Sequence, residues 1–296
     1  MRRIVPWALL AALTLGVAVG VGAGIGAAGQ SSPLSARAQI AQIIGATKRA
    51  HSARFAYSRI STSTNALLRS HGSGTGEVDF ATDSMRTSER DRSTGLVGVS
   101  SATSRPATQT TVQADIRIGR TDYVQLSPGI RVLGARWVRT TFPAGTIGPF
   151  GVLGQVSPLD TLALDQSVRG LRVETVGPAT VDGRATTKLL VSVPGCGAAV
   201  HGHGVRQSLA PTEVWVDNRH RLVQARAVTH IAVSKDAYRG SAFVGRYLAG
   251  RSTIVAVVRV YDFGAPVSVS APPVLPQSSS SFSEGFAEIK AKGCAT

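Results

Sequence analysis

The sequence predicts an α+β fold built on one large antiparallel sheet with few helices. Strand-like segments recur from Phe55 to Phe263, and polar and apolar residues alternate within many of them, as in Arg136–Thr140. This alternation is typical of antiparallel strands that bury one face. Only two stretches have helical spacing. The chain of 296 residues is long enough to bury a substantial core, and the strand series has no clean break, so we expect one folded domain.

The first predicted helix covers Leu34–His51. Three isoleucines and a threonine follow the spacing i, i+3, i+4 and i+7, which indicates an amphipathic helix; they are Ile40, Ile43, Ile44 and Thr47.

The second predicted helix begins at Ser157-Pro158-Leu159-Asp160, which combines a serine cap, a proline at the first position and a carboxylate three residues after the cap. Leu162 follows on the same segment, which we expect to end before Gly170.

The predicted strands lie between polar turns. They cover residues 55–60, 77–80, 84–90, 112–118, 122–126, 136–142, 171–176, 185–193, 213–217, 222–231 and 253–263. Asp182-Gly183 predicts a tight hairpin turn. The glycine-rich stretch Gly72–Gly76 is interpreted as a turn between strands, and Ser93–Thr111 as a loop or an edge hairpin.

The N-terminus has the pattern of an export signal. Arg2 and Arg3 precede a long uncharged, largely apolar run, so everything after residue 38 is expected outside the cytoplasmic membrane. A cleaved signal peptide and a retained membrane anchor both fit this run. We therefore divide the chain into a signal or anchor at 1–38, a ligand-binding domain at 39–271 and a Pro/Ser-rich tail at 272–296.

The charge balance is strongly basic, with 32 Lys and Arg against 17 Asp and Glu and a net charge of +15. The arginines are spread singly, and no basic run is interleaved with aromatic residues. Nucleic-acid binding needs a basic footprint rather than a basic total, so we expect no nucleic-acid partner. A basic surface facing anionic lipid is compatible with this composition.

The two cysteines, Cys196 and Cys294, predict a disulfide because an even count in an exported chain is typical of an oxidising compartment. A metal site built on Cys196, His201 and His203 is the alternative, but this spacing matches no standard zinc pattern. We expect no metal.

The sequence contains no Gly-x-Ser-x-Gly elbow, no His-Glu-x-x-His and no Walker loop. Gly72–Gly76 runs into a strand, whereas a phosphate loop opens a helix. Asp160 and Asp165 lie five residues apart on the predicted helix and therefore on different faces. We expect neither enzymatic activity nor a cofactor.

Two segments carry a family resemblance. Val176–Leu189 passes through the turn Asp182-Gly183 into a strand, and Thr212–Val223 contains Trp215-Val216-Asp217 before a second turn. This order, after the Ser-Pro-Leu-Asp helix start, resembles the LolA/LolB-like carriers and most closely their actinobacterial LppX/LprAFG branch. The resemblance implies a strongly curved antiparallel sheet, a half-open β-barrel, wrapped over a few helices and enclosing an apolar cavity for acyl chains. Branch members are typically lipoproteins, whereas this chain has no lipid-attachment cysteine after its apolar run.

The resemblance implies an exported cell-envelope protein, periplasmic, secreted or anchored to the outer face of the cytoplasmic membrane. Its expected partners are a lipid or glycolipid, the membrane surface and an envelope protein. The function it implies is binding acyl chains and carrying them between membranes; a membrane-anchored sensor or interaction domain without cargo is the alternative. We expect the cavity to be lined by Ile40, Ile43, Ile44, Leu159, Leu162 and Trp215. Each of these residues also fits a plain core position.

Overall fold

One antiparallel sheet and one helix make up the regular structure that the computed structural model describes. The described residues are 34–64, 69–96, 106–119, 121–125, 137–141, 159, 170–192, 205–234 and 249–272. All of them lie within one unit, Leu34–Thr296. The helix α1 spans Ala36–Lys48. The twelve strands are β1 Ser52–Ser63, β2 Arg69–Asp79, β3 Ser84–Leu96, β4 Pro106–Ile118, β5 Thr121–Gln125, β6 Trp137–Thr141, β7 Arg172–Val181, β8 Arg184–Ser192, β9 Val205–Leu209, β10 Thr212–Val216, β11 Leu222–Val233 and β12 Gly250–Tyr261.

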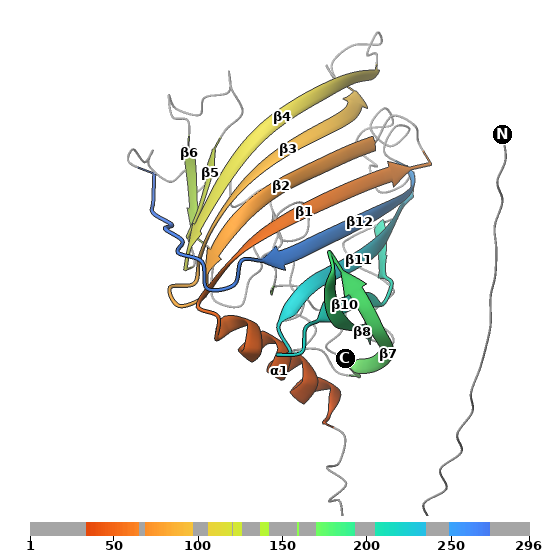
Figure 1. Ribbon diagram of the computed structural model, residues 1–296. Coiled ribbons are helices and arrows are strands. Elements are labelled where there is room, and N and C mark those ends of the chain that lie inside the picture. The colour runs from red at the N-terminus through yellow and green to blue at the C-terminus, as the bar shows by residue number, and fades with distance from the viewer. Residues whose placement is uncertain are drawn as a thin grey trace, which may run out of the picture. The chain divides into compact units, whose positions relative to one another are not determined.

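The strand order shows that two meanders meet side by side. The order is β6-β5-β4-β3-β2-β1-β12-β11-β10-β8-β7, and β9 pairs with β11 off this path. The first and last strands, β1 and β12, therefore pair with each other near the middle of the sheet, where Phe55 lies opposite Val260. In the described part of the chain, β6 and β7 end this path without closing it. The long strands bend along their length (Figure 1), so the curved antiparallel sheet expected from the sequence is confirmed.

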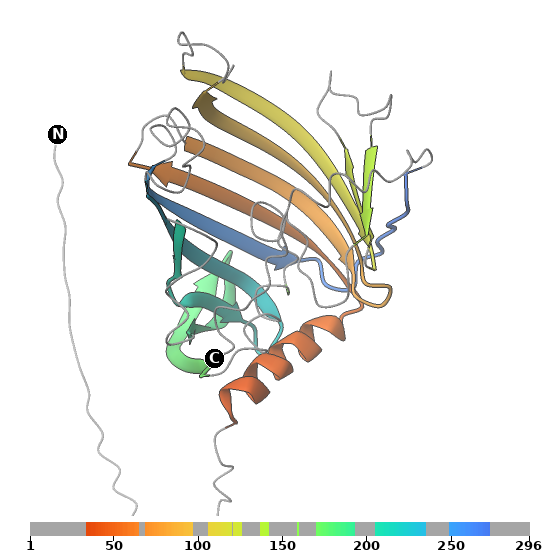
Figure 2. The ribbon, with the colours of Figure 1, turned by 180° about the vertical axis from the view of Figure 1, so that it is seen from behind.

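Helix α1 follows the sequence prediction closely. Ser35 caps its start, because the serine hydroxyl accepts a hydrogen bond from the amide of Ala38 at 3.3 Å. At its last turn the buried hydroxyl of Thr47 donates to the carbonyl of Ile43 at 2.8 Å and accepts from the amide of Leu222 at 2.9 Å. This second bond ties the end of the helix to the start of β11. Figure 2 shows α1 at the end of the sheet where β1 begins and β12 ends.

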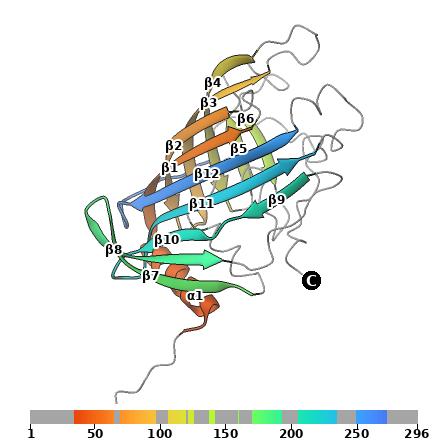
Figure 3. The same cartoon turned by 90° about the vertical axis from the view of Figure 1, so that its right-hand side faces the viewer.

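The core lies at this same end of the sheet. Ile40 and Ile43 of α1 pack in one cluster with Phe55, Val214 and Val258. Figure 3 shows β11, β10, β8 and β7 in succession beside the helix. The sheet face that carries Phe55 and Val258, and on which the helix side chains pack, is called the inner face below.

Most predicted strands are confirmed, with boundaries that differ by a few residues. The turn at Asp182-Gly183 joins β7 to β8, and both residues have positive φ, 48° and 78°, which is the geometry of a two-residue hairpin loop. The segment 93–111 contains the end of β3 and the start of β4, which pair as a hairpin. Among the described strands, β5 pairs with β4 only at Asp115–Ile118, so the part of β4 in this segment pairs with β3 alone and the expected edge hairpin is confirmed.

The prediction of a turn at Gly72–Gly76 was wrong. These residues lie in the interior of β2, paired with β1 on one side and β3 on the other. Glycines favour turns locally, but pairing on both sides of the strand overrides that preference. The sequence analysis also did not predict β9.

The second predicted helix lies almost wholly outside the described residues, which there include only Leu159 and Gly170. Residues 1–33 of the candidate signal segment, the tail from residue 273, and Cys196, His201, His203 and Cys294 lie outside them as well. In the described ranges no helix is long and apolar enough to cross a membrane.

Candidate functional site

The inner face has an unusual surface along β2, because three glycines occupy its inner positions. Gly72, Gly74 and Gly76 alternate with outward-facing residues and lie opposite Arg59, Tyr57 and Phe55 of β1. A Cβ added at Gly74 would come within 2.6 Å of the Tyr57 ring, and one at Gly76 within 2.8 Å of the Phe55 ring. The β1 side chains therefore lie across the glycines, close to the sheet.

One half of the inner face is apolar. Val258 and Val260 of β12 are 8% and 2% exposed, and Ala225 of β11 and Val214 of β10 are buried with them. These residues form the core cluster with α1.

The apolar inner face continues past this packed core. Ala256 and Ile254 follow Val258 at every second position of β12, and Ala227 of β11 lies opposite Ala256. These three residues, called the apolar strip below, are only partly buried and do not belong to the core cluster. The strip therefore presents apolar surface that the described core leaves incompletely covered.

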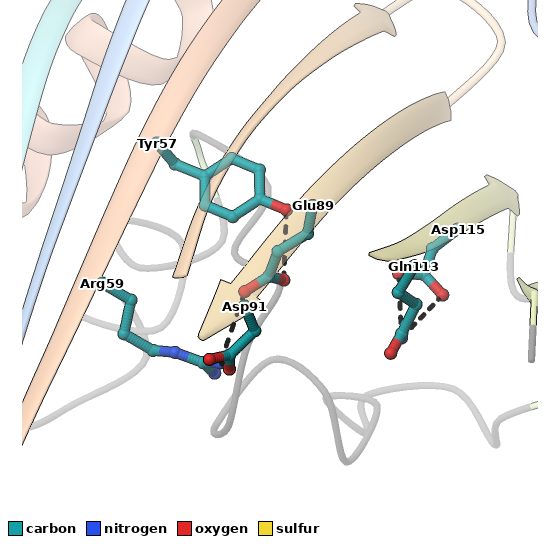
Figure 4. Close-up of polar contacts among 6 residues, drawn as sticks. All are labelled: Tyr57, Arg59, Glu89, Asp91, Gln113 and Asp115. Atoms are coloured by element: carbon teal, nitrogen blue, oxygen red, sulfur yellow. Dashed lines mark hydrogen bonds and ion pairs between the residues drawn. The ribbon is translucent and has the colours of Figure 1, made fainter. Parts of the chain in front are cut away.

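The other half of the inner face carries a cluster of polar and charged side chains, shown in Figure 4. The Tyr57 hydroxyl donates to a Glu89 oxygen at 3.2 Å, and Arg59 forms ion pairs with Glu89 at 3.3 Å and Asp91 at 2.8 Å. Glu89 is only 6% exposed. Burial raises its pKa above the usual value, although the charge of Arg59 opposes this shift. Burial and the neighbouring Glu89 also raise the pKa of Tyr57, which stays protonated.

Asp115 of β4 extends this cluster. It is 6% exposed, and the amide nitrogen of Gln113 lies 3.2 Å from each of its carboxylate oxygens. Burial raises the pKa of Asp115 to about 7. The Gln113 hydrogen bond and the charge of Arg117 oppose this shift, and repulsion from Asp122 and Glu89 adds to it. Next to it, Arg117 pairs with Asp122 at 2.8 Å.

Thr87 of β3 lies directly opposite Asp115 and opposite Gly76. Its side chain is 2% exposed, and its hydroxyl has no hydrogen-bond partner among the described residues. We use the name polar cluster for Tyr57, Arg59, Thr87, Glu89, Asp91, Gln113 and Asp115.

Among the expected cavity residues, the structure brings Ile40, Ile43 and Leu159 together in the core cluster, where each is at most 5% exposed. Ile44 is partly buried against the same cluster. Leu162 lies outside the described residues.

Trp215 lies elsewhere. It follows the buried Val214 on β10 and therefore occupies the opposite face, where the Lys188 nitrogen lies 5.1 Å from its ring centroid. Glu213 shares this face and pairs with Arg226 at 2.8 Å. The structure thus does not place Trp215 with the helix residues.

Sequence reasoning missed the polar cluster entirely. Its members come from three strands, and only the register of β1, β2, β3 and β4 brings them to one face. One signal was available, because Gly72, Gly74 and Gly76 recur with the period of a strand. Within the described ranges, no group of three or more His, Cys, Asp and Glu residues is arranged to hold a metal ion.

No family model matches the chain, and no curated protein matches it. Among solved structures it is similar to the lipoprotein LppX of Mycobacterium tuberculosis, at 18% identity and a TM-score of 0.38, over 79% of this chain and 98% of that chain. It is similar to LprF of Mycobacterium bovis at 14% identity and a TM-score of 0.35, over 80% of this chain and 96% of that one. It is also similar to a LolA superfamily protein of Nitrosomonas europaea, at 9% identity and a TM-score of 0.29, over 79% of this chain and 96% of that chain. The resemblance is one of fold, with LppX, LprF and a LolA superfamily protein among the similar structures.

Proposed function

We propose that this chain is an exported cell-envelope protein that binds the acyl chains of a lipid or glycolipid on its inner face and carries them between membranes. The observation that supports this most directly is the apolar strip. Along β12 the inner face stays apolar from Val260 to Ile254. Val260 is only 2% exposed, whereas Ala256 and Ile254 are only partly buried.

Acyl chains fit such a surface because burying apolar area is favourable without directional contacts. Each buried methylene contributes about 0.8 kcal/mol before ordering costs. The side chains expected to line the ligand on the helix side are Ile40, Ile43, Ile44, Leu159 and Leu162. Trp215 was expected to line the ligand with them, but it lies on the opposite face of the sheet, so this geometry does not support that role.

The test compares two adjacent residues of β12 that point to opposite faces. Ala256→Trp fills the apolar strip, whereas Val257→Trp adds the same ring on the other face. The wild type and both variants are purified from the native host without detergent, and bound lipid is measured by native mass spectrometry and extraction. We expect lipid in the wild type and in Val257→Trp, and little in Ala256→Trp, with similar thermal stability in all three.

A wild-type protein that carries no lipid would overturn this proposal. The alternative of a membrane-anchored sensor or interaction domain without cargo would then account for the fold better. Equal lipid in both variants would show that the apolar strip does not hold the chains.

A further inference from the structure

The polar cluster and its neighbours carry more negative than positive charge. With Arg117 and Asp122 included, the group contains the four carboxylates Glu89, Asp91, Asp115 and Asp122 and the two guanidinium groups of Arg59 and Arg117. This local excess of acid lies in a protein whose net charge is +15. The average composition of the chain therefore does not account for the excess of acidic groups at this place.

The two arginines pair with Glu89, Asp91 and Asp122, and the charge of Arg117 also acts on Asp115. Arg59 pairs with Glu89 and Asp91, and Arg117 pairs with Asp122. The hydrogen bonds to Asp115 come from a neutral amide, that of Gln113. Asp115 is therefore a buried carboxylate whose printed hydrogen-bond donor is neutral, and Asp91 Oδ1 is a further buried acceptor without a partner among the described residues.

A second, independent observation lies beside it. The Thr87 hydroxyl is buried on the same face, directly opposite Asp115, and has no partner in the described part of the chain. Leaving a buried hydroxyl unpaired is unfavourable, and buried polar groups in folded proteins nearly always have a partner. A hydrogen-bonding group placed between Thr87 and Asp115 would satisfy both.

The polar cluster adjoins the apolar strip. Arg59 of β1 lies opposite Ala256 of β12, and Tyr57 lies opposite Val258. An amphiphile on the inner face can therefore lay its chain along β12 while its head group reaches β1 and β3.

We propose that the polar cluster binds a primary ammonium group of the ligand, which donates hydrogen bonds to the Asp115 carboxylate and the Thr87 hydroxyl. This inference rests on the proposed function, because the chain of the same ligand occupies the apolar strip. An ammonium group supplies both the missing donors and the missing positive charge. A neutral sugar leaves the excess charge uncompensated, and a phosphate is repelled by it.

The charged state of Asp115 makes this binding depend on pH. The titratable and charged groups that face it are Tyr57 from β1, Glu89 from β3, Arg117 from its own strand and Asp122 from β5. Because the pKa of Asp115 is about 7, its carboxylate is mostly charged above this pH. Affinity for an ammonium group is therefore expected to rise with pH through neutrality.

The probes are decylammonium, decyl glucoside and decyl sulfate, which share one chain and differ only in the head group. Each is titrated below its micelle concentration into the full-length protein by calorimetry. We expect decylammonium to bind at least about tenfold more tightly than the other two probes, which corresponds to about 1.4 kcal/mol in binding free energy. Its affinity is expected to rise between about pH 6 and about pH 8, where Asp115 loses its proton.

Two variants test the residues, and a third serves as the control. Asp115→Asn and Thr87→Val each remove one proposed contact, and both are expected to weaken decylammonium binding while leaving decyl glucoside binding unchanged. Retained glucoside binding shows that the variants are folded. Glu174→Gln removes an exposed carboxylate on β7 and is expected to leave every affinity unchanged.

The possible results separate the two proposals. Equal binding of decylammonium and decyl glucoside, or a preference for ammonium that survives Asp115→Asn, overturns the ammonium site while lipid binding stands. A protein that binds none of the three probes overturns lipid binding and the ammonium site together.

Discussion

At the scale of single residues, Asp115 sets a pH dependence of stability. Its pKa is raised from 3.8 in the unfolded chain to about 7 in the fold. The folded state therefore binds this proton more tightly. Its contribution to stability is complete below about pH 4 and is lost as pH rises through about 7.

We therefore expect the melting temperature to rise when the pH is lowered from about 8 to about 5.5, since each pKa unit corresponds to about 1.4 kcal/mol. Asp115→Asn should flatten this dependence, which differential scanning calorimetry measures. The pKa of Glu89 is also raised, so Glu89 contributes a pH dependence in the same direction. If the melting temperature of Asp115→Asn still depends on pH, Glu89→Gln tests whether Glu89 is the cause. A melting temperature that falls over this interval contradicts the prediction.

Two glycines should respond oppositely to alanine. At Gly76 a Cβ overlaps the Phe55 ring and the Arg86 carbonyl, so Gly76→Ala should destabilise the fold by about 1–3 kcal/mol. At Gly45, inside α1, the nearest atom to a new Cβ is the end of the Arg49 side chain at 3.6 Å. Gly45→Ala should therefore stabilise the fold by roughly 0.5–1 kcal/mol. Urea unfolding measures the free energy of unfolding of both variants, and equal effects at the two positions would contradict this prediction.

At the scale of elements, a buried hydroxyl ties α1 to the sheet in addition to the core packing of Ile40 and Ile43. Thr47→Val keeps the shape of the side chain but leaves the Leu222 amide without the partner it has at 2.9 Å. We expect a loss of about 1–3 kcal/mol in the free energy of unfolding, the cost of an unpaired buried donor. Thr47→Ser retains the hydroxyl and is the matched control. Similar unfolding of the two variants would show that packing, and not this hydrogen bond, holds the helix.

Local patterns predicted the elements better than they predicted the site. Helix α1 carries its cap and its apolar spacing within one short segment, and the turn Asp182-Gly183 is specified by two residues. The strand nature of Gly72–Gly76 depends on its neighbours β1 and β3, which no local pattern shows. The meeting of Thr87 with Asp115 likewise requires the register between two strands. Site residues gathered from several strands are therefore beyond prediction from spacing alone.

At the scale of the whole molecule, Arg2, Arg3 and the apolar run that follows predict export. A reporter that is active only in the cytoplasm, fused after Thr296, should give no signal, because the chain beyond residue 38 is expected outside the cytoplasmic membrane. The same fusion without residues 1–38 should be active and serves as the control. An active full-length fusion would contradict the prediction that the chain is exported.

The cysteine pair is a prediction at the same scale. A bond between Cys196 and Cys294 would close a loop of about a hundred residues and stabilise the fold by roughly 4–5 kcal/mol in the chain-entropy model. Peptide mapping without reductant should recover the two cysteines in one linked fragment. Recovery of both as free thiols refutes the pairing.

The pairing of β1 with β12 has a consequence for how the chain reaches its fold. Arg54 meets Tyr261, so this seam joins segments from opposite ends of the described sequence. Until β12 is available, both meanders have an unpaired edge, and such edges readily pair with other chains. Contacts between distant segments also slow folding, because the loop between them must close first. The nascent protein therefore depends on its last strand, and the interval before that strand arrives is when the chain is most exposed to self-association.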